Sequence, residues 1–113
     1  MKVSEYIKNG LKNFVENLPP EDYQLLGEAQ EKIHKIRCFA KINNDIIEDA
    51  KFNSSKRCKK LLSIADFICE KIKNQKLNEI KINDNDILEF FKEEKDREKL
   101  IQRLILIKKA LGL

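Results

Sequence analysis

Hydrophobic residues recur along this chain at spacings of three and four, which is the period of a helix that is apolar on one face. The stretch from Ser4 to Leu18 has this spacing, with Ser4 placed to cap the helix and Pro19 placed to end it. A second helix is predicted from Pro20 to Lys41. Its apolar positions form a heptad-like stripe of Leu26, Ala29, Ile33, Ile36 and Ala40.

Short polar clusters divide the second half of the chain into further helices. Asn43-Asn44-Asp45 and Asn53-Ser54-Ser55 are typical of a helix stop followed by a cap, which predicts a short helix over 45–50 and a longer one over 55–73. A loop over 74–83 then precedes a helix that begins at Asn83 or Asp84 and a last helix that begins at Asp96. The sequence therefore predicts an all-α fold, a single-domain bundle of five to six helices over residues 1–113.

Two of these helices are apolar on more than one side. Phe67 lies off the main stripe of the helix over 55–73, and Ile105 and Leu106 widen the stripe of the last helix. We interpret Phe67, Ile105 and Leu106 as a face that contacts a protein partner or a second copy of the chain. The alternative is that both wide faces close a single internal core.

Charge is distributed unevenly over this pattern. Residues 1–31 carry a net charge of −3, residues 32–76 carry +7 and residues 77–113 carry none, which accounts for the total of +4. A segment that holds all of the positive excess is typical of a surface for nucleic acid or another polyanion. A solvated helix face has the same appearance.

The predicted nucleic-acid-binding residues lie on the second helix and at the start of the helix over 55–73. If these helices pack side by side, their basic side chains form one strip that contacts phosphates without reading bases, because few aromatic residues are nearby for stacking. The strip consists of Lys32, Lys35, Arg37, Lys41, Lys56, Arg57, Lys59 and Lys60.

Candidate chemistry is sparse. His34, Cys38, Cys58 and Cys69 are the residue types of a zinc site, but no Cys-x-x-Cys accompanies them, and we expect no metal and no cofactor. Buried cysteines that act as small apolar residues explain Cys58 and Cys69 more simply. With one histidine and no glycine-rich phosphate loop, the chain is predicted not to be an enzyme.

Composition limits the setting. Apolar residues make up 42% of the chain and charged residues 37%, and no apolar run approaches the ~20 residues of a membrane span. An odd number of cysteines and a polar N-terminus without a secretory signal favour a cytoplasmic protein.

These features predict a non-catalytic helical accessory subunit of a nucleic-acid-processing complex, with nucleic-acid backbone on the basic strip and a protein partner on the apolar face. The alternative is a protein-only adaptor or homo-oligomeric module that binds no nucleic acid. No motif is specific enough to assign the chain to a family.

Overall fold

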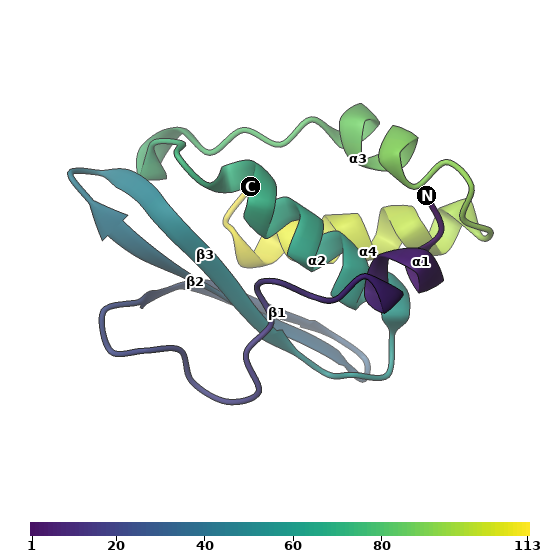
Figure 1. Ribbon diagram of the computed structural model, residues 1–113, viewed down its shortest axis with the longest axis horizontal. Helices are drawn as coiled ribbons and strands as arrows, with labels where there is room; N and C mark the ends of the chain where they lie inside the picture. Colours follow the sequence, from purple (N-terminus) through teal and green to yellow (C-terminus); the bar gives the residue numbers. More distant parts are fainter.

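The computed structural model describes all 113 residues, as a three-stranded antiparallel sheet with four α-helices (Figure 1). The strands, in the order β1-β2-β3, are β1 (Gln24–Glu31), β2 (His34–Asn43) and β3 (Ile46–Ser54). The helices are α1 (Val3–Lys8), α2 (Lys59–Ile72), α3 (Asp84–Phe90) and α4 (Arg97–Ala110), with a single 3-10 turn, η1, at Leu77–Glu79. The prediction of an all-α bundle was therefore wrong, and the fold is α/β.

The two predicted helices over 20–41 and 45–50 are the three strands. Two-residue turns connect them, at Lys32-Ile33 and at Asn44-Asp45. Asn44 and Asp45 have φ angles of 52° and 65°, and positive φ at both central residues is the requirement of the hairpin turn that matches the twist of two strands. The polar residues near position 44 thus end one strand and start the next, instead of capping a helix.

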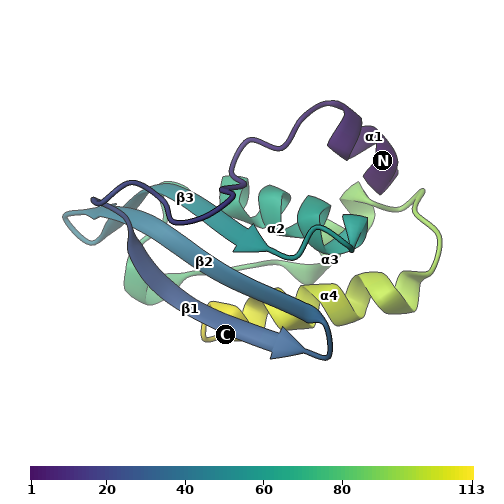
Figure 2. The same ribbon diagram turned by 90° about the horizontal axis from the view of Figure 1, so that it is seen from below.

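The core lies between one face of the sheet and the pair α2 and α4, and the two views show both helices on that same face (Figures 1 and 2). Ile36, Cys38 and Ala40 lie at every second position of β2, and all three are buried in this core. The apolar stripe of α2 faces them. The side of α2 that faces away from the sheet is covered in part by α1 and α3, which explains why this helix is apolar over more than one side.

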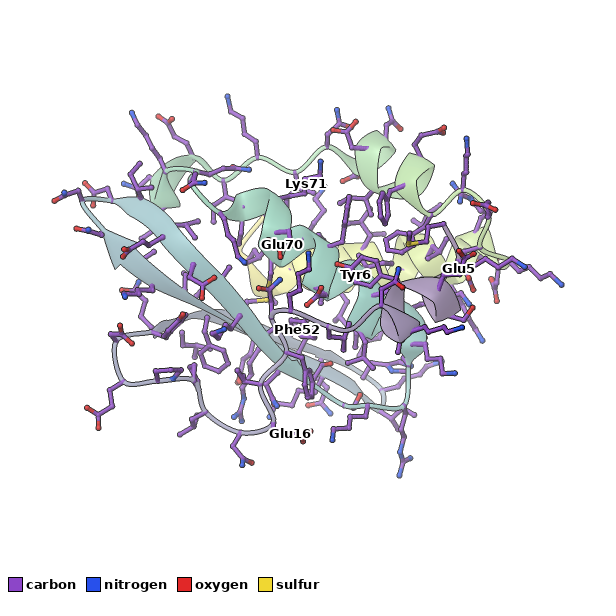
Figure 3. All side chains as sticks on the ribbon, viewed as in Figure 1. Glu5, Tyr6, Glu16, Phe52, Glu70 and Lys71 are labelled. Atoms are coloured by element: carbon purple, nitrogen blue, oxygen red, sulfur yellow. The ribbon has the colours of Figure 1, made fainter.

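The N-terminal segment is held against the sheet by backbone pairing. The helix predicted over 4–18 ends early, at Lys8, and Gly10 follows with a φ of 96° that is unfavourable for other residues. The chain then runs along the outer edge of β3, where Phe52 donates its N–H to Asn13 and accepts one from Val15, each at 2.9 Å. Figure 3 shows Phe52 at this edge and Tyr6 where α1 meets α2.

The helices predicted over 55–73, from Asn83 or Asp84 and from Asp96 are present, but the first begins later, at Lys59, with Cys58 as its cap in place of the Asn53-Ser54-Ser55 cluster. Asn83 accepts hydrogen bonds from two backbone amides of α3, and Asp96 accepts one from Lys99 at the start of α4. α4 also lies directly against β1. Gly27 makes this possible because it has no side chain, and a Cβ atom at this position would overlap the backbone carbonyl of Ala110. This contact places the middle of α4 beside the β1–β2 turn, where the candidate site is found.

Candidate functional site

Three elements meet at an open pocket of about 460 Å³. The first residue of β2 contributes His34, the residue before α2 contributes Cys58, and the middle of α4 contributes Arg103. These three side chains are far apart in the sequence, and the packing of α2 and α4 on the sheet brings them together. The pocket is the place where the fold gathers its chemically active groups.

Cys58 is the N-cap of α2, with an extended backbone that directs its side chain toward the first turn. Its Sγ accepts a hydrogen bond from the Leu61 amide at 3.4 Å and a second from Arg103 Nε at 3.3 Å. A helix N-terminus and a guanidinium are the surroundings in which reactive cysteines are found in proteins. The half-buried thiol of Cys58 also opens onto the pocket, so a ligand can reach it.

Arg103 links this thiol to His34. Its Nη2 lies 2.9 Å from His34 Nε2, and because a guanidinium only donates, Nε2 accepts and the imidazole proton is on Nδ1. That Nδ1 is buried and has no hydrogen-bond partner. Burial lowers the pKa of His34 below its ordinary value of 6.5, and the charge of Arg103 lowers it further, so the imidazole is neutral at neutral pH.

We expect His34 to make the fold less stable below neutral pH. Its pKa is lower in the folded state than in the unfolded chain, so the unfolded chain binds the proton first as the pH falls below about 6.5, and stability is lost across that window. Urea unfolding at pH 7.5 and 5.5 should show this loss in the wild type and a smaller one in His34→Gln. An equal loss in both proteins would assign the effect to other groups.

The pocket is strongly cationic. Burial alone would raise the pKa of Glu94, but hydrogen bonds from the Val3 amide and the Lys60 ammonium outweigh burial and lower that pKa. The Glu94 carboxylate is therefore ionised, and it forms an ion pair with Lys60 at 3.0 Å. No other acidic residue lines the pocket. The positive residues that line it are Arg57, Lys59, Lys60, Lys99 and Arg103.

The other two cysteines are not available to the pocket. Cys38 and Cys69 are buried in the core, and burial raises the pKa of Cys38 to about 12 and that of Cys69 well above its ordinary value. They act as small apolar residues, the interpretation that had been extended to Cys58 as well. No three histidine, cysteine or acidic side chains converge to hold a metal ion, and in the pocket Arg103 contacts both Cys58 and His34.

The eight basic residues predicted to bind nucleic acid do not form one strip on two packed helices. Lys35, Arg37 and Lys41 lie on β2 and Lys32 lies in the turn before it, while the other four surround the start of α2. Half of the set is paired with carboxylates, in the ion pairs Arg37–Glu28, Lys41–Asp22, Lys56–Glu16 and Lys60–Glu94.

The three residues predicted to contact a partner are separated in the structure. Phe67 packs against Phe90 with ring centroids 4.1 Å apart and remains half-buried, and Leu106 is 2% exposed in the core. Ile105 is 55% exposed on α4, where its neighbour Ile101 is exposed as well. A role for Ile105 in partner contact stays a prediction.

The geometry defines a small α/β protein with a cationic thiol pocket, and the architecture is found among solved structures. A crystal structure from thermophilic Fervidobacterium islandicum AW-1, described as a candidate iron–sulfur cluster assembly scaffold protein for the SUF system, superposes with a TM-score of 0.64. The match covers 97% of this chain and 90% of that chain at 16% sequence identity, so it shows the fold. No family model matches the sequence, and no curated protein is detectably similar to it.

These findings correct the predicted function. The nucleic-acid-processing subunit required a helical bundle with a continuous basic strip, and the protein-only adaptor required the same bundle with a wide apolar face. The chain has instead the fold of the iron–sulfur scaffold structure, with its reactive groups in one pocket. Neither function is supported. No helix of the protein is long and apolar enough to cross a membrane.

Sequence reasoning did not find Arg103. It grouped His34 with all three cysteines as residue types of a zinc site, whereas the structure places only Cys58 in the same pocket as His34. One signal was present in the sequence: Cys58 directly precedes a long apolar helix, in the position of a cap.

Proposed function

We propose that this protein is a sulfur carrier in iron–sulfur cluster assembly, and that Cys58 carries the sulfur as a persulfide. The observation that carries the proposal is the position of Cys58, the one thiol that opens onto the pocket, in hydrogen-bond contact with Arg103. The likeness to a structure described as an iron–sulfur cluster assembly scaffold supports this setting.

A carrier fits the residues better than a complete scaffold does. Iron–sulfur clusters are held mainly by cysteine thiolates, four for each common cluster. This chain offers Cys58 and, beside it, the neutral imidazole of His34, with the cation of Arg103 between them. A fixed positive charge between two ligands repels iron and attracts an anionic sulfur species. The pocket therefore suits the sulfur rather than the metal.

Sulfur uptake needs no enzyme activity from this chain. The Cys58 thiolate attacks the outer sulfur of a donor persulfide, one S–S bond forms as another breaks, and the donor leaves as a thiolate. Nothing is oxidised or reduced overall. We therefore propose a non-catalytic role in the cytoplasm, where thiols stay reduced, with protein partners that deliver and collect the sulfur.

A second candidate is a cluster shared between two chains. Cys58 and His34 lie in the same pocket, so a partner that supplied two further ligands and displaced Arg103 would complete a set of four. This candidate requires iron to bind, whereas the carrier does not.

We expect the wild-type protein to gain the mass of one sulfur atom when it is treated with cysteine persulfide, and Cys58→Ser to gain none. Intact-mass spectrometry before and after reduction measures the change. Cys69→Ala is the matched control, because Cys69 is buried and should leave uptake unchanged. Equal uptake by Cys58→Ser would overturn the carrier. Iron–sulfur absorbance after incubation with iron and sulfide would favour the shared cluster instead.

A further inference from the structure

Arg103 is a buried cation without an acidic partner. Arg103 is 7% exposed, and its guanidinium donates hydrogen bonds to Cys58 Sγ and to His34 Nε2. No carboxylate lies within ion-pair distance of this guanidinium. Buried charges are almost always compensated by an opposite charge, because leaving one uncompensated costs several kcal/mol. No carboxylate of the folded chain compensates the charge of Arg103, and an anion bound in the pocket would do so.

The charged residues around Arg103 also carry more positive than negative charge. Arg57 and Lys59 have no ion-pair partner, and Lys99 has only a long contact of 3.9 Å with Asp96. The pocket lining carries five positive residues against the single carboxylate of Glu94, a net charge equal to that of the whole chain, +4. The amides at the N-terminal end of α2 add to this field. The pocket is therefore a site for an anion with more than one negative charge.

We propose that the pocket binds a small dianionic sulfur oxyanion of the thiosulfate class, which donates its outer sulfur to Cys58. The sulfonate group rests against Arg103 and the lysines, and the outer sulfur faces the Cys58 thiol. The anion supplies the charge that Arg103 lacks. This inference deepens the proposed carrier by naming a source of its sulfur, and its binding step stands without the carrier.

The transfer balances in atoms and electrons. The Cys58 thiolate attacks the outer sulfur of thiosulfate, an S–S bond forms between them, and the S–S bond of thiosulfate breaks. Its electron pair leaves with sulfite, and Cys58 keeps the outer sulfur as an anionic persulfide. No external oxidant or reductant is required. The total charge is the same before and after the step, so the cationic pocket holds both the substrate and the products.

Binding is tested with thiosulfate on Cys58→Ser, which cannot react, by titration calorimetry in low-chloride buffer. We expect saturable binding that weakens as salt rises. Introducing Arg57→Gln and Lys99→Gln into the Cys58→Ser protein should lower its affinity for thiosulfate by at least about tenfold. Lys109→Gln is the matched control, because Lys109 is exposed on the same helix as Lys99 and outside the pocket. Binding that is equally strong in the double variant, or absent in Cys58→Ser, would overturn the proposal.

Transfer is tested separately, so that this inference and the carrier fail in different ways. Wild-type protein is incubated with thiosulfate or with cysteine persulfide, sulfite release is measured, and the protein mass is recorded. Sulfur uptake from both donors, with sulfite released from thiosulfate, supports the inference. Uptake from cysteine persulfide alone overturns it and leaves the carrier intact. Thiosulfate binding without uptake from either donor overturns the carrier and the transfer step together.

Discussion

Replacing Asp66 with alanine is expected to lower the free energy of unfolding by about 3–5 kcal/mol, a large part of the stability of a domain of this size. The Asp66 side chain on α2 is fully buried, and three donors of the N-terminal segment meet it. The Tyr6 hydroxyl donates at 2.7 Å, and the backbone amides of Lys12 and Asn13 donate at 2.9 and 2.7 Å. Alanine would leave all three without an acceptor.

The same contacts fix the N-terminal segment in place. The Asn13 side chain donates to the Asp66 backbone carbonyl and accepts from the Lys73 ammonium. Asn13 is therefore fixed both to α2 and to the residue that follows this helix. The backbone pairing of Asn13 and Val15 with β3 begins next to this point. Losing Asp66 should therefore release residues 9–15 as well as destabilise the core.

Urea unfolding measures the loss, and limited trypsin digestion at Lys8 and Lys12 detects the released segment. Asp66→Asn keeps one acceptor oxygen and should lose less than Asp66→Ala. Glu48→Ala removes an exposed carboxylate and should stay within about 0.5 kcal/mol of the wild type. A change of under about 1 kcal/mol in Asp66→Ala would show that these hydrogen bonds do not anchor the segment.

The second half of the fold could be predicted from local signals. Asn83 and Asp96 are polar residues directly before apolar stretches of helical period, and each caps a helix in the structure. In these segments local capping and tertiary packing favour the same structure, so the sequence pattern alone is sufficient.

The strands could not be predicted from the helical stripe, because two periods fit the same residues. Ile36 and Ala40 are four apart, which suits a helix, and they also alternate with Arg37 and Lys41, which suits a strand. Exposure in the folded protein distinguishes the helical period from the strand period, because Ile33, a member of the helical stripe, is 60% exposed at the hairpin turn. The Asn44-Asp45 pair was the local signal for a hairpin, and it was interpreted as a cap.

The site was beyond sequence reasoning for a related reason. Cys58 and His34 were recognised as residues of metal-site type, but their proximity depends on the hairpin and on α4 lying across β1. Arg103 gave no signal, since an arginine in a charged helix is ordinarily exposed. Its burial beside a thiol became visible only in the folded protein, and it is the observation from which we propose an anion, and not a metal ion, as the ligand of the pocket.

Arg103→Cys is expected to convert the pocket into a zinc site, with at least about a hundredfold gain in affinity over the wild type. In the wild type, Cys58 Sγ and His34 Nε2 both contact the guanidinium, so both point toward the volume that it occupies. A thiol at position 103 would vacate that volume, remove the repelling charge and supply a third ligand. Cysteine and histidine bind zinc at about 2.3 and 2.0 Å, distances that side chains converging on one small volume can reach.

Cobalt substitution gives a direct measurement, because thiolate-bound Co²⁺ in a tetrahedral site has intense visible absorption, and zinc then displaces it. Arg103→Ser is the matched control, since it removes the same charge without supplying a thiolate, and it should bind more weakly than Arg103→Cys. Cys58→Ser in the Arg103→Cys background should abolish the tight site. If Arg103→Cys and Arg103→Ser bound the metal no more tightly than the wild type, Cys58 and His34 would not converge on the space behind the guanidinium. If both bound it as tightly as expected for Arg103→Cys alone, the charge of Arg103, rather than the number of ligands, would be what keeps metal out of the pocket.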